Sequence, residues 1–177
     1  MYKNSLITIL GLACFSSSVA LADQNYVGAS FAFVDYSEEG IRDDASLTMI
    51  AGRLGAKFNK NLSGEIRVGF GVGDDSVNVL GTDVDVELNT MFGAYVRGGV
   101  EVAKSFYPYV VLGYTRGEIT LSVPGYSRSD SESDVSFGLG ADVDINDKLT
   151  FNVEYMNYFD KDGAEIDGFS LGLVTRF

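Results

Sequence analysis

The chain has 177 residues with 21 glycines, two prolines, ten tyrosines and twelve phenylalanines, a composition that suits many β-strands in one domain. Its formal charge of −12 excludes a nucleic-acid binder, which needs a basic surface to meet phosphates. The same charge argues against docking from the cytoplasm on an anionic membrane surface.

Residues 1–22 have the features of a secretory signal peptide. Lys3 supplies the positive start, an apolar run extends from Leu6 to Phe15, and Ala20-Leu21-Ala22 forms an A-x-A cleavage site. The apolar run is too short for a transmembrane helix, which needs about 20 residues. We therefore expect export, cleavage after Ala22 and a mature domain of residues 23–177, whose formal charge is −13 because Lys3 is lost.

Cys14 is the only cysteine and lies within this signal. Leu12-Ala13-Cys14 could also be a lipoprotein signal, in which Cys14 would be lipidated. Gly11 stands where such a signal usually has leucine, and the A-x-A site is better formed, so we favour cleavage after Ala22. The mature chain is then expected to have no disulfide and no thiol chemistry.

After residue 22, apolar and polar residues alternate with a period of two in eight successive segments, which predicts eight β-strands. The segments are YVGASFAFV (26–34), LTMIAGRLGAKF (47–58), LSGEIRVGF (62–70), VDVELNTMFGAYVR (84–97), YPYVVLGYTRGEI (107–119), DVSFGLGADVDI (134–145), LTFNVEYMNY (149–158) and GFSLGLVTRF (168–177).

Each segment has one apolar face and one face of glycine, serine and charged residues. In segment 84–97 the alternation places Leu88 and Phe92 on the apolar face and Glu87 on the polar face. Segment 107–119 is ambiguous because residues 110–112 are all apolar. Arg116 and Glu118 indicate that its even-numbered positions belong to the polar face.

The connections between these segments alternate in length. Short ones are expected at 59–61, 100–105 and 146–147, and longer polar, acidic loops at 35–46, 71–83, 121–133 and 159–167. Short turns at one end and long loops at the other are the pattern of an outer-membrane barrel, with the long loops outside.

The polar face distinguishes a membrane barrel from a soluble one. In a soluble sandwich or barrel the apolar faces point inward, whereas in a membrane barrel they face lipid and the polar faces share the interior. Small residues let strands curve, mixed charges can pair across a narrow lumen, and closure removes sheet edges that lipid does not tolerate. We predict an all-β fold, an eight-stranded antiparallel up-and-down transmembrane β-barrel. The residues expected in its lumen are Arg53, Lys57, Glu65, Arg67, Glu87, Met91, Tyr95, Arg97, Asp142, Asp144, Glu154 and Arg176.

The signal peptide, the eight strands, the alternating loop lengths and the terminal Phe177 together resemble small outer-membrane barrels of the OmpA/OmpX type. More specifically, residues 108–117 and 135–155 resemble the porin-family group called the outer membrane protein β-barrel domain. The resemblance implies a location in the outer membrane of a Gram-negative bacterium, contact with outer-membrane lipids, and a monomer. It also implies recognition by the barrel assembly machinery through Phe177.

The sequence contains no histidine. Enzymes in small outer-membrane barrels use a histidine as general base, and without one a serine or a water molecule has no ordinary activator. We therefore predict that the protein is not an enzyme, and we assign no catalytic residue and no cofactor.

Metal motifs are weak. Asp142, Asp144 and Asn146 imitate the start of a calcium loop, but Asp147 and Val153 occupy its glycine and glutamate positions. Acidic pairs in the predicted loops are typical of solvated loop tips, and we assign no metal-ligating residue. These pairs are Glu38-Glu39, Asp43-Asp44, Asp74-Asp75 and Asp160-Asp162.

Three functions fit these features. The first is a non-enzymatic surface barrel whose acidic loops contribute to envelope integrity or to adhesion, with a partner that is not strongly anionic. The second is a narrow, porin-like passive channel for ions or small solutes. The third is a soluble barrel that binds a lipophilic ligand. The sequence identifies no nucleic-acid partner and no specific surface partner.

Overall fold

The alternating segments all form strands in the computed structural model, which describes residues 25–38, 45–79, 82–123, 126–161 and 164–177. The predicted signal peptide and its cleavage site lie outside these residues. Within them, no helix has the length and apolar character needed to span a membrane. The strands are β1 (Asn25–Glu38), β2 (Ala45–Asn59), β3 (Leu62–Gly71), β4 (Asp74–Val79), β5 (Thr82–Gly99), β6 (Phe106–Val123), β7 (Tyr126–Asp144), β8 (Leu149–Lys161) and β9 (Ala164–Arg176).

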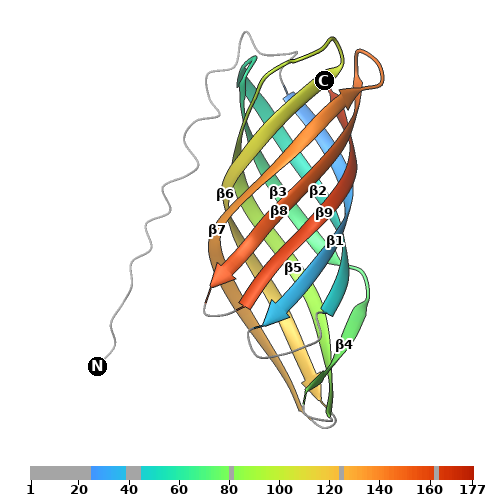
Figure 1. Ribbon diagram of the computed structural model, residues 1–177, viewed down its shortest axis with the longest axis vertical. Coiled ribbons are helices and arrows are strands. Elements are labelled where there is room, and N and C mark those ends of the chain that lie inside the picture. Colours follow the sequence, from blue (N-terminus) through green and yellow to red (C-terminus); the bar gives the residue numbers. More distant parts are fainter. Residues whose placement is uncertain (1–24, 39–44, 80–81, 124–125, 162–163) are drawn as a thin grey trace, which may run out of the picture.

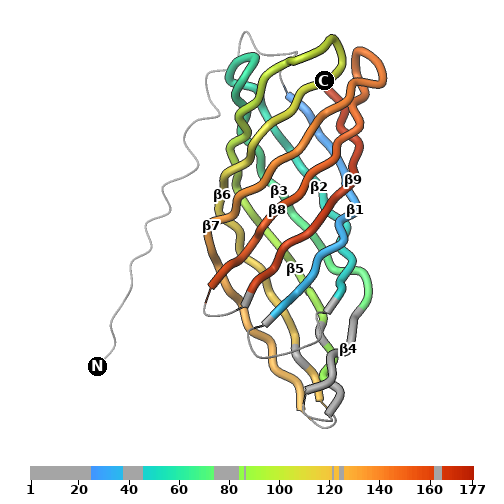
Figure 2. The backbone as a smooth tube through the Cα atoms, in the orientation of Figure 1, coloured from blue at the N-terminus to red at the C-terminus, as the bar shows by residue number. Residues whose placement is uncertain are grey.

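Eight of these strands close into a ring (Figure 1). Their order is β3-β2-β1-β9-β8-β7-β6-β5, a β3–β5 pairing completes the circle, and every pairing is antiparallel. The tube in Figure 2 shows the strands tilted against the long axis, as closure of a sheet requires. The predicted eight-stranded antiparallel barrel is confirmed.

The two ends of the barrel differ. One end, here called the short-turn end, contains the connections 60–61, 100–105 and 145–148. The C-terminus lies at the same end (Figure 1). At the opposite, long-hairpin end, two predicted loops contain strands. Segment 71–83 includes β4, which pairs only with β5 among the described residues, and segment 121–133 forms the ends of β6 and β7.

Cross-strand hydroxyl contacts explain why the serine-rich segment is extended. Thr120 and Ser129 share a hydrogen bond of 2.8 Å, and Ser122 and Ser127 share one of 2.9 Å. Such pairs stabilise adjacent strands. Polarity alone had indicated a loop, whereas the pairing of β6 with β7 continues from Phe106 to Val123.

The outer wall of the ring is apolar. Except in segments 84–97 and 107–119, the predicted apolar faces point outward and the predicted polar faces point inward. An apolar band with many aromatic side chains is the surface that lipid covers in a membrane barrel. The exposed outward aromatic residues are Phe31, Phe33, Phe58, Phe70, Phe92, Phe106, Tyr114, Phe137, Tyr155, Phe169 and Phe177.

Segment 84–97 departs from the prediction because β5 contains a bulge. The pairing with β6 shifts between Leu88 and Thr90, so one extra residue enters the strand and the alternation changes face. Leu88, predicted to face outward, is buried at 2% exposure. Glu87, predicted to lie in the lumen, is exposed. Beyond the bulge, Arg97 points inward and Phe92 outward, as predicted.

The predicted orientation of segment 107–119 was wrong. In β6 the odd-numbered Tyr109, Val111 and Thr115 are buried, whereas Arg116 and Glu118 are exposed on the outer side. Both charges lie in the part of β6 nearer the long-hairpin end, and Arg116 donates to Ser131 at 2.9 Å. An outward charge is tolerated where the strand has left the apolar band. The charges of Arg116 and Glu118 therefore do not indicate which face of β6 points inward.

Candidate functional site

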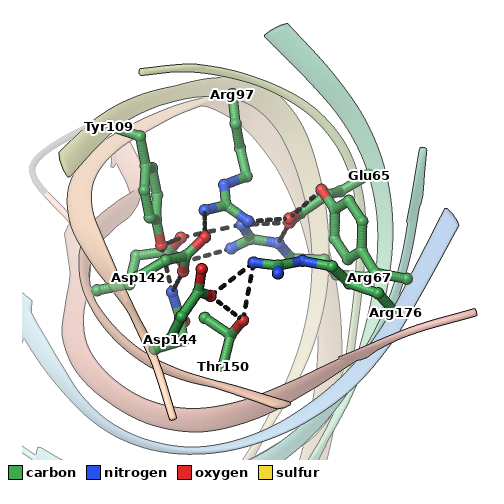
Figure 3. Close-up of polar contacts among 11 residues, drawn as sticks. Glu65, Arg67, Arg97, Tyr109, Asp142, Asp144, Thr150 and Arg176 are labelled. Carbon is green, nitrogen blue, oxygen red and sulfur yellow. Dashed lines mark hydrogen bonds and ion pairs between the residues drawn. The ribbon is translucent and has the colours of Figure 1, made fainter. Parts of the chain in front are cut away.

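The interior near the short-turn end is filled by charged residues that contact one another (Figure 3). Arg176 lies 2.6 Å from Asp144, and Thr150 donates to the same carboxylate at 2.6 Å. Arg97 lies 2.6 Å from Asp142, which also accepts from Asn152 at 2.6 Å. These contacts join β5, β7, β8 and β9.

Deeper in the barrel, Glu65 on β3 connects two arginines. Its carboxylate lies 2.6 Å from Arg67 and 2.7 Å from Arg97, and Tyr26 donates to it at 2.8 Å. All of these side chains are buried. A buried charge is costly unless it is paired and hydrogen-bonded, and here each charge has a partner of opposite sign. The Nε atom of Arg97 alone among these groups has no hydrogen-bond partner in the described residues.

Glu154 on β8 completes the interior ion-pair network, which consists of Glu65, Arg67, Arg97, Asp142 and Glu154. Arg67 pairs with Glu154 through both guanidinium Nη atoms, one contact being 3.0 Å. Tyr109 donates to Glu154 at 2.8 Å, and the Arg97 guanidinium stacks 3.6 Å from the centroid of the Tyr109 ring. Strands on opposite walls are thereby tied together.

Glycines of the inner wall make room for the tyrosines of this network. The Tyr26 ring, from β1, occupies the space where a Cβ of Gly55 on β2 would stand, and it reaches Glu65 on β3. Tyr109, from β6, covers Gly140 on β7 in the same way and reaches Glu154 on β8. Each ring therefore spans a neighbouring strand that has no side chain in its path.

The interior toward the long-hairpin end is apolar, which the sequence did not indicate. An interior apolar cluster of buried side chains from six strands fills this half of the barrel. A second irregularity, between Asn157 and Phe159 in the β8–β9 pairing, places consecutive buried residues at 156–159. The members of the cluster larger than alanine are Val34, Leu47, Met49, Leu88, Met91, Tyr95, Tyr109, Val111, Met156, Tyr158, Phe159 and Ile166.

Cavities within the barrel are small. One of about 20 Å³ lies beside Arg53, and another of about 20 Å³ lies between Tyr26 and Arg97. At the short-turn end the interior widens into an open hollow of about 340 Å³, which is lined in part by Lys57, Lys104 and Tyr107. A volume of 20 Å³ accommodates about one water molecule, so the described side chains leave no wide passage.

The structure places nearly all the predicted lumen residues inside the ring. Arg53, Met91 and Tyr95 are buried there, and Lys57 is half-buried with its ammonium group 5.9 Å from the Tyr107 ring centroid. Glu87 is the exception. The tyrosines at 26 and 109 were not singled out from the sequence, although each occupies a position of the inward face and has a glycine at the paired position of the next strand.

The residues of the weak calcium motif do not converge. Asp142 faces Arg97, Asp144 faces Arg176, and Asn146 accepts hydrogen bonds from the backbone N–H groups of Lys148 and Leu149 in the turn. Among the described residues there is no group of three carboxylate, histidine or cysteine side chains placed to hold a metal ion. Glu39, Asp43, Asp44 and Asp162 of the predicted acidic loops lie outside the described residues.

A second candidate site is the sheet that extends past the ring at the long-hairpin end (Figure 1). This protruding sheet consists of β4, residues 82–88 of β5, residues 118–123 of β6 and residues 126–136 of β7. The pairing of β7 with β8 begins only at Phe137, so residues 126–136 pair on one side alone among the described strands. The exposed part of this edge, residues 126–132, can offer backbone hydrogen bonds to a partner.

Comparisons with known proteins agree with this architecture. The family model described as the outer membrane protein beta-barrel domain matches residues 7–177. None of the curated proteins matches the chain. Ail, the attachment invasion locus protein of Yersinia pestis, superposes with a TM-score of 0.65 at 15% identity, over 89% of this chain and 100% of Ail.

Two further solved structures share the fold. Neisserial surface protein A superposes with a TM-score of 0.65 at 13% identity, over 86% of this chain and 97% of its own. The outer membrane protein OprG of Pseudomonas aeruginosa superposes with a TM-score of 0.63 at 15% identity, over 89% and 97%. Identities this low show the fold alone. The family match, which spans nearly the whole sequence, shows that the chain belongs to the outer membrane protein β-barrel domain family.

Proposed function

We propose that this chain is a non-enzymatic integral protein of the Gram-negative outer membrane, and that its long-hairpin end faces outward and contacts a surface partner. The observation that carries the proposal is the protruding sheet. A tilted strand crosses the hydrocarbon core with about 9–11 residues, whereas β5, β6 and β7 have 18, 18 and 19 residues. About half of each of these strands is therefore free to stand above the membrane.

The chemistry of the protruding sheet limits its partner. Among its side chains that the structure describes, the exposed charges are mostly acidic and include Asp85, Glu87, Glu118 and Glu132. A strongly anionic partner would be repelled, and a neutral or basic protein surface would be favoured. The exposed part of the one-sided edge of β7, residues 126–132, provides main-chain groups for such a partner.

The resemblance in fold to Ail, which is named for attachment and invasion, supports a role in adhesion. Contributions to envelope integrity fit the same architecture, because the barrel is anchored by its apolar wall. The absence of histidine from the sequence supports a non-enzymatic role. The filled interior argues against the alternative, a narrow porin-like channel.

Shortening the β6–β7 hairpin tests the proposal. Gly117 and Glu132 are paired in the register, so residues 118–131 can be replaced by a two-residue turn that leaves the membrane part of β6 and β7 intact. We expect bacteria displaying the shortened protein to adhere less to immobilised extracellular-matrix proteins or cultured cells than bacteria displaying the intact protein. Electrophoresis with and without heating checks that both barrels are folded.

A matched control is a variant in which the acidic residues Asp130 and Glu132 become asparagine and glutamine while the hairpin keeps its length. If charge selects the partner, this variant should bind anionic surfaces better than the intact protein. Equal adhesion by intact and shortened proteins, both displayed at equal levels, would contradict a role for the protruding sheet.

Export and assembly belong to the same proposal. Cleavage after Ala22 should give an intact mass for a chain that begins at Asp23, and a product that begins at lipidated Cys14 would overturn that assignment. Phe177 is exposed, and its backbone N–H donates to Asn25 at 3.1 Å where β9 meets β1. Deleting Phe177 should lower the amount of folded barrel in the outer membrane if the assembly machinery reads this residue.

A further inference from the structure

One part of the protruding sheet has an open edge whose sequence is complementary to itself. Residues 126–132 of β7 (YSRSDSE) are all exposed, and they pair with β6 on one side and with no described strand on the other. Such an edge presents backbone N–H and C=O groups with which a further strand can pair. The side chains of the edge determine which strand fits.

The charges of this edge are paired with one another or with a neighbour. The Arg128 guanidinium lies 2.8 Å from the Asp130 carboxylate, and Glu132 lies 3.7 Å from the ammonium group of Lys161 at the end of β8. The edge is therefore close to neutral, although the exposed charges described for the protruding sheet are mostly acidic. A neutral protein surface is the kind of partner that the proposed function favours.

A second copy of the same edge fits it when the two strands run antiparallel with Ser129 at the centre. In this two-fold arrangement Ser129 lies opposite its own copy, and Ser127 lies opposite Ser131. Arg128 of each copy lies opposite Asp130 of the other, with both side chains on the same face. Each of these charges then has an opposite charge beside it along its own strand and across the ladder, which stabilises a sheet.

Neighbouring registers oppose like charges. A pairing centred on Arg128 places the two Arg128 side chains opposite each other, and a pairing centred on Asp130 does the same with two carboxylates. A parallel pairing in register aligns equal charges along the whole segment. Because like charges at opposed positions destabilise a sheet, the antiparallel pairing centred on Ser129 is favoured.

The strand direction determines where the second copy lies. Copies of this barrel in one membrane have the same orientation, so their β7 strands cannot run antiparallel side by side. A barrel in a facing membrane points the opposite way, and its β7 strand then runs in the required direction. Since the protruding sheet is at the end that is proposed to face outward, two such edges meet between neighbouring cells.

We propose that residues 126–132 of β7 pair with the same residues of a second copy on a neighbouring cell, in an antiparallel ladder centred on Ser129. This pairing rests on the proposed surface function and identifies its partner. A ladder of seven residues is weak by itself. Many copies on two apposed cells bind together, and multivalency raises the total strength of such contacts. Bacteria that carry the protein therefore aggregate with one another.

Single cysteines test the register, since the only native cysteine is at position 14, within the predicted signal peptide. Cells that display Ser127→Cys are mixed with cells that display Ser131→Cys, and the mixture is oxidised. We expect a disulfide-linked dimer in the mixture, where the two positions are opposed, and none in either population alone. Ser129→Cys should form the dimer within one population. A mixture that yields no more dimer than the separate populations would overturn the proposal.

An exchange of charges tests recognition without cysteines. Arg128→Asp alone opposes carboxylates and should abolish aggregation. Adding Asp130→Arg restores complementarity between copies of the doubly substituted chain, so these cells should aggregate with one another. In a mixture with differently labelled cells that display the intact chain, like charges are opposed, and the two kinds of cell should form separate aggregates. Aggregates that contain both kinds of cell would contradict the ladder.

Folding and adhesion are measured on the same cells. Both substituted residues are exposed, and electrophoresis with and without heating verifies that each barrel is folded. If shortening the β6–β7 hairpin lowers adhesion to matrix proteins while intact and doubly substituted cells aggregate together, the partner is not a second copy and the surface function stands. If the cells sort but matrix adhesion does not depend on the hairpin, the second copy is the partner and matrix adhesion is not the function.

Discussion

Arg67 on β3 and Glu154 on β8 face each other across the full width of the barrel, since four steps separate the two strands in either direction around the ring of eight. The two residues are 87 positions apart in sequence. The pair holds opposite walls together through two guanidinium contacts, and Glu65 and Tyr109 satisfy the remaining groups. This ion pair therefore has a structural role, because it connects opposite walls of the barrel through the interior.

Glu154→Gln should destabilise the barrel strongly, because it leaves Arg67 with one charged partner instead of two in a buried position. Removing one member of a buried ion pair costs about 3–5 kcal/mol in other proteins. The measurement is reversible urea unfolding in lipid vesicles, followed by tyrosine fluorescence. Glu132→Gln is the matched control, since Glu132 pairs with Lys161 at 3.7 Å on the exposed surface and should show no resolvable change.

Gly55→Ala should also destabilise the protein, because the added Cβ would overlap the Tyr26 ring and displace its hydroxyl from Glu65. Overpacking of this kind costs about 1–3 kcal/mol. Gly98→Ala provides the comparison, since a Cβ at Gly98 meets no atom within 4 Å. Equal unfolding midpoints for the two variants would show that the Tyr26 ring does not depend on the space at Gly55.

The orientation of β6 can be checked with single cysteines, because the only native cysteine is at position 14, within the predicted signal peptide. Leu112 is 60% exposed on the outer wall, and the adjacent Val111 is 3% exposed in the interior. A fluorophore on Leu112→Cys should be quenched by brominated lipids, and Val111→Cys should label slowly and escape quenching. The reverse result would restore the orientation that Arg116 and Glu118 suggested.

The folded monomer should conduct little current in planar bilayers. The interior ion-pair network and the interior apolar cluster follow one another along the barrel, and the cavities among them have volumes of about 20 Å³. We expect at most small, infrequent conductance steps, because a hydrated ion does not fit spaces that hold about one water molecule. Stable conductance comparable to that of a general porin would favour the channel function.

Local alternation was sufficient to predict the strands and most of their faces. An apolar residue at every second position determines which side of a strand meets lipid, whatever its partner strand is. The faces of the last segment, with Phe169 and Leu171 outward and Ser170 inward, were therefore predictable from the sequence. The same two-residue period predicts the number of strands. The spacing between the periodic segments predicts that short connections lie at one end of the barrel and long ones at the other.

Only the tertiary structure decided where that period is interrupted and which interior residues meet. The bulge after Leu88 depends on how β5 must pair with two strands at once, β4 and β6 at one end and β3 and β6 at the other. The contact between Arg67 and Glu154 depends on ring closure and on the stagger of eight strands. A residue pattern within one strand determines neither of them. For the same reason, the sequence placed Arg53 in the lumen, but only the assembled barrel shows that Arg67 lies opposite it and that its Nη1 atom has no hydrogen-bond partner among the described residues.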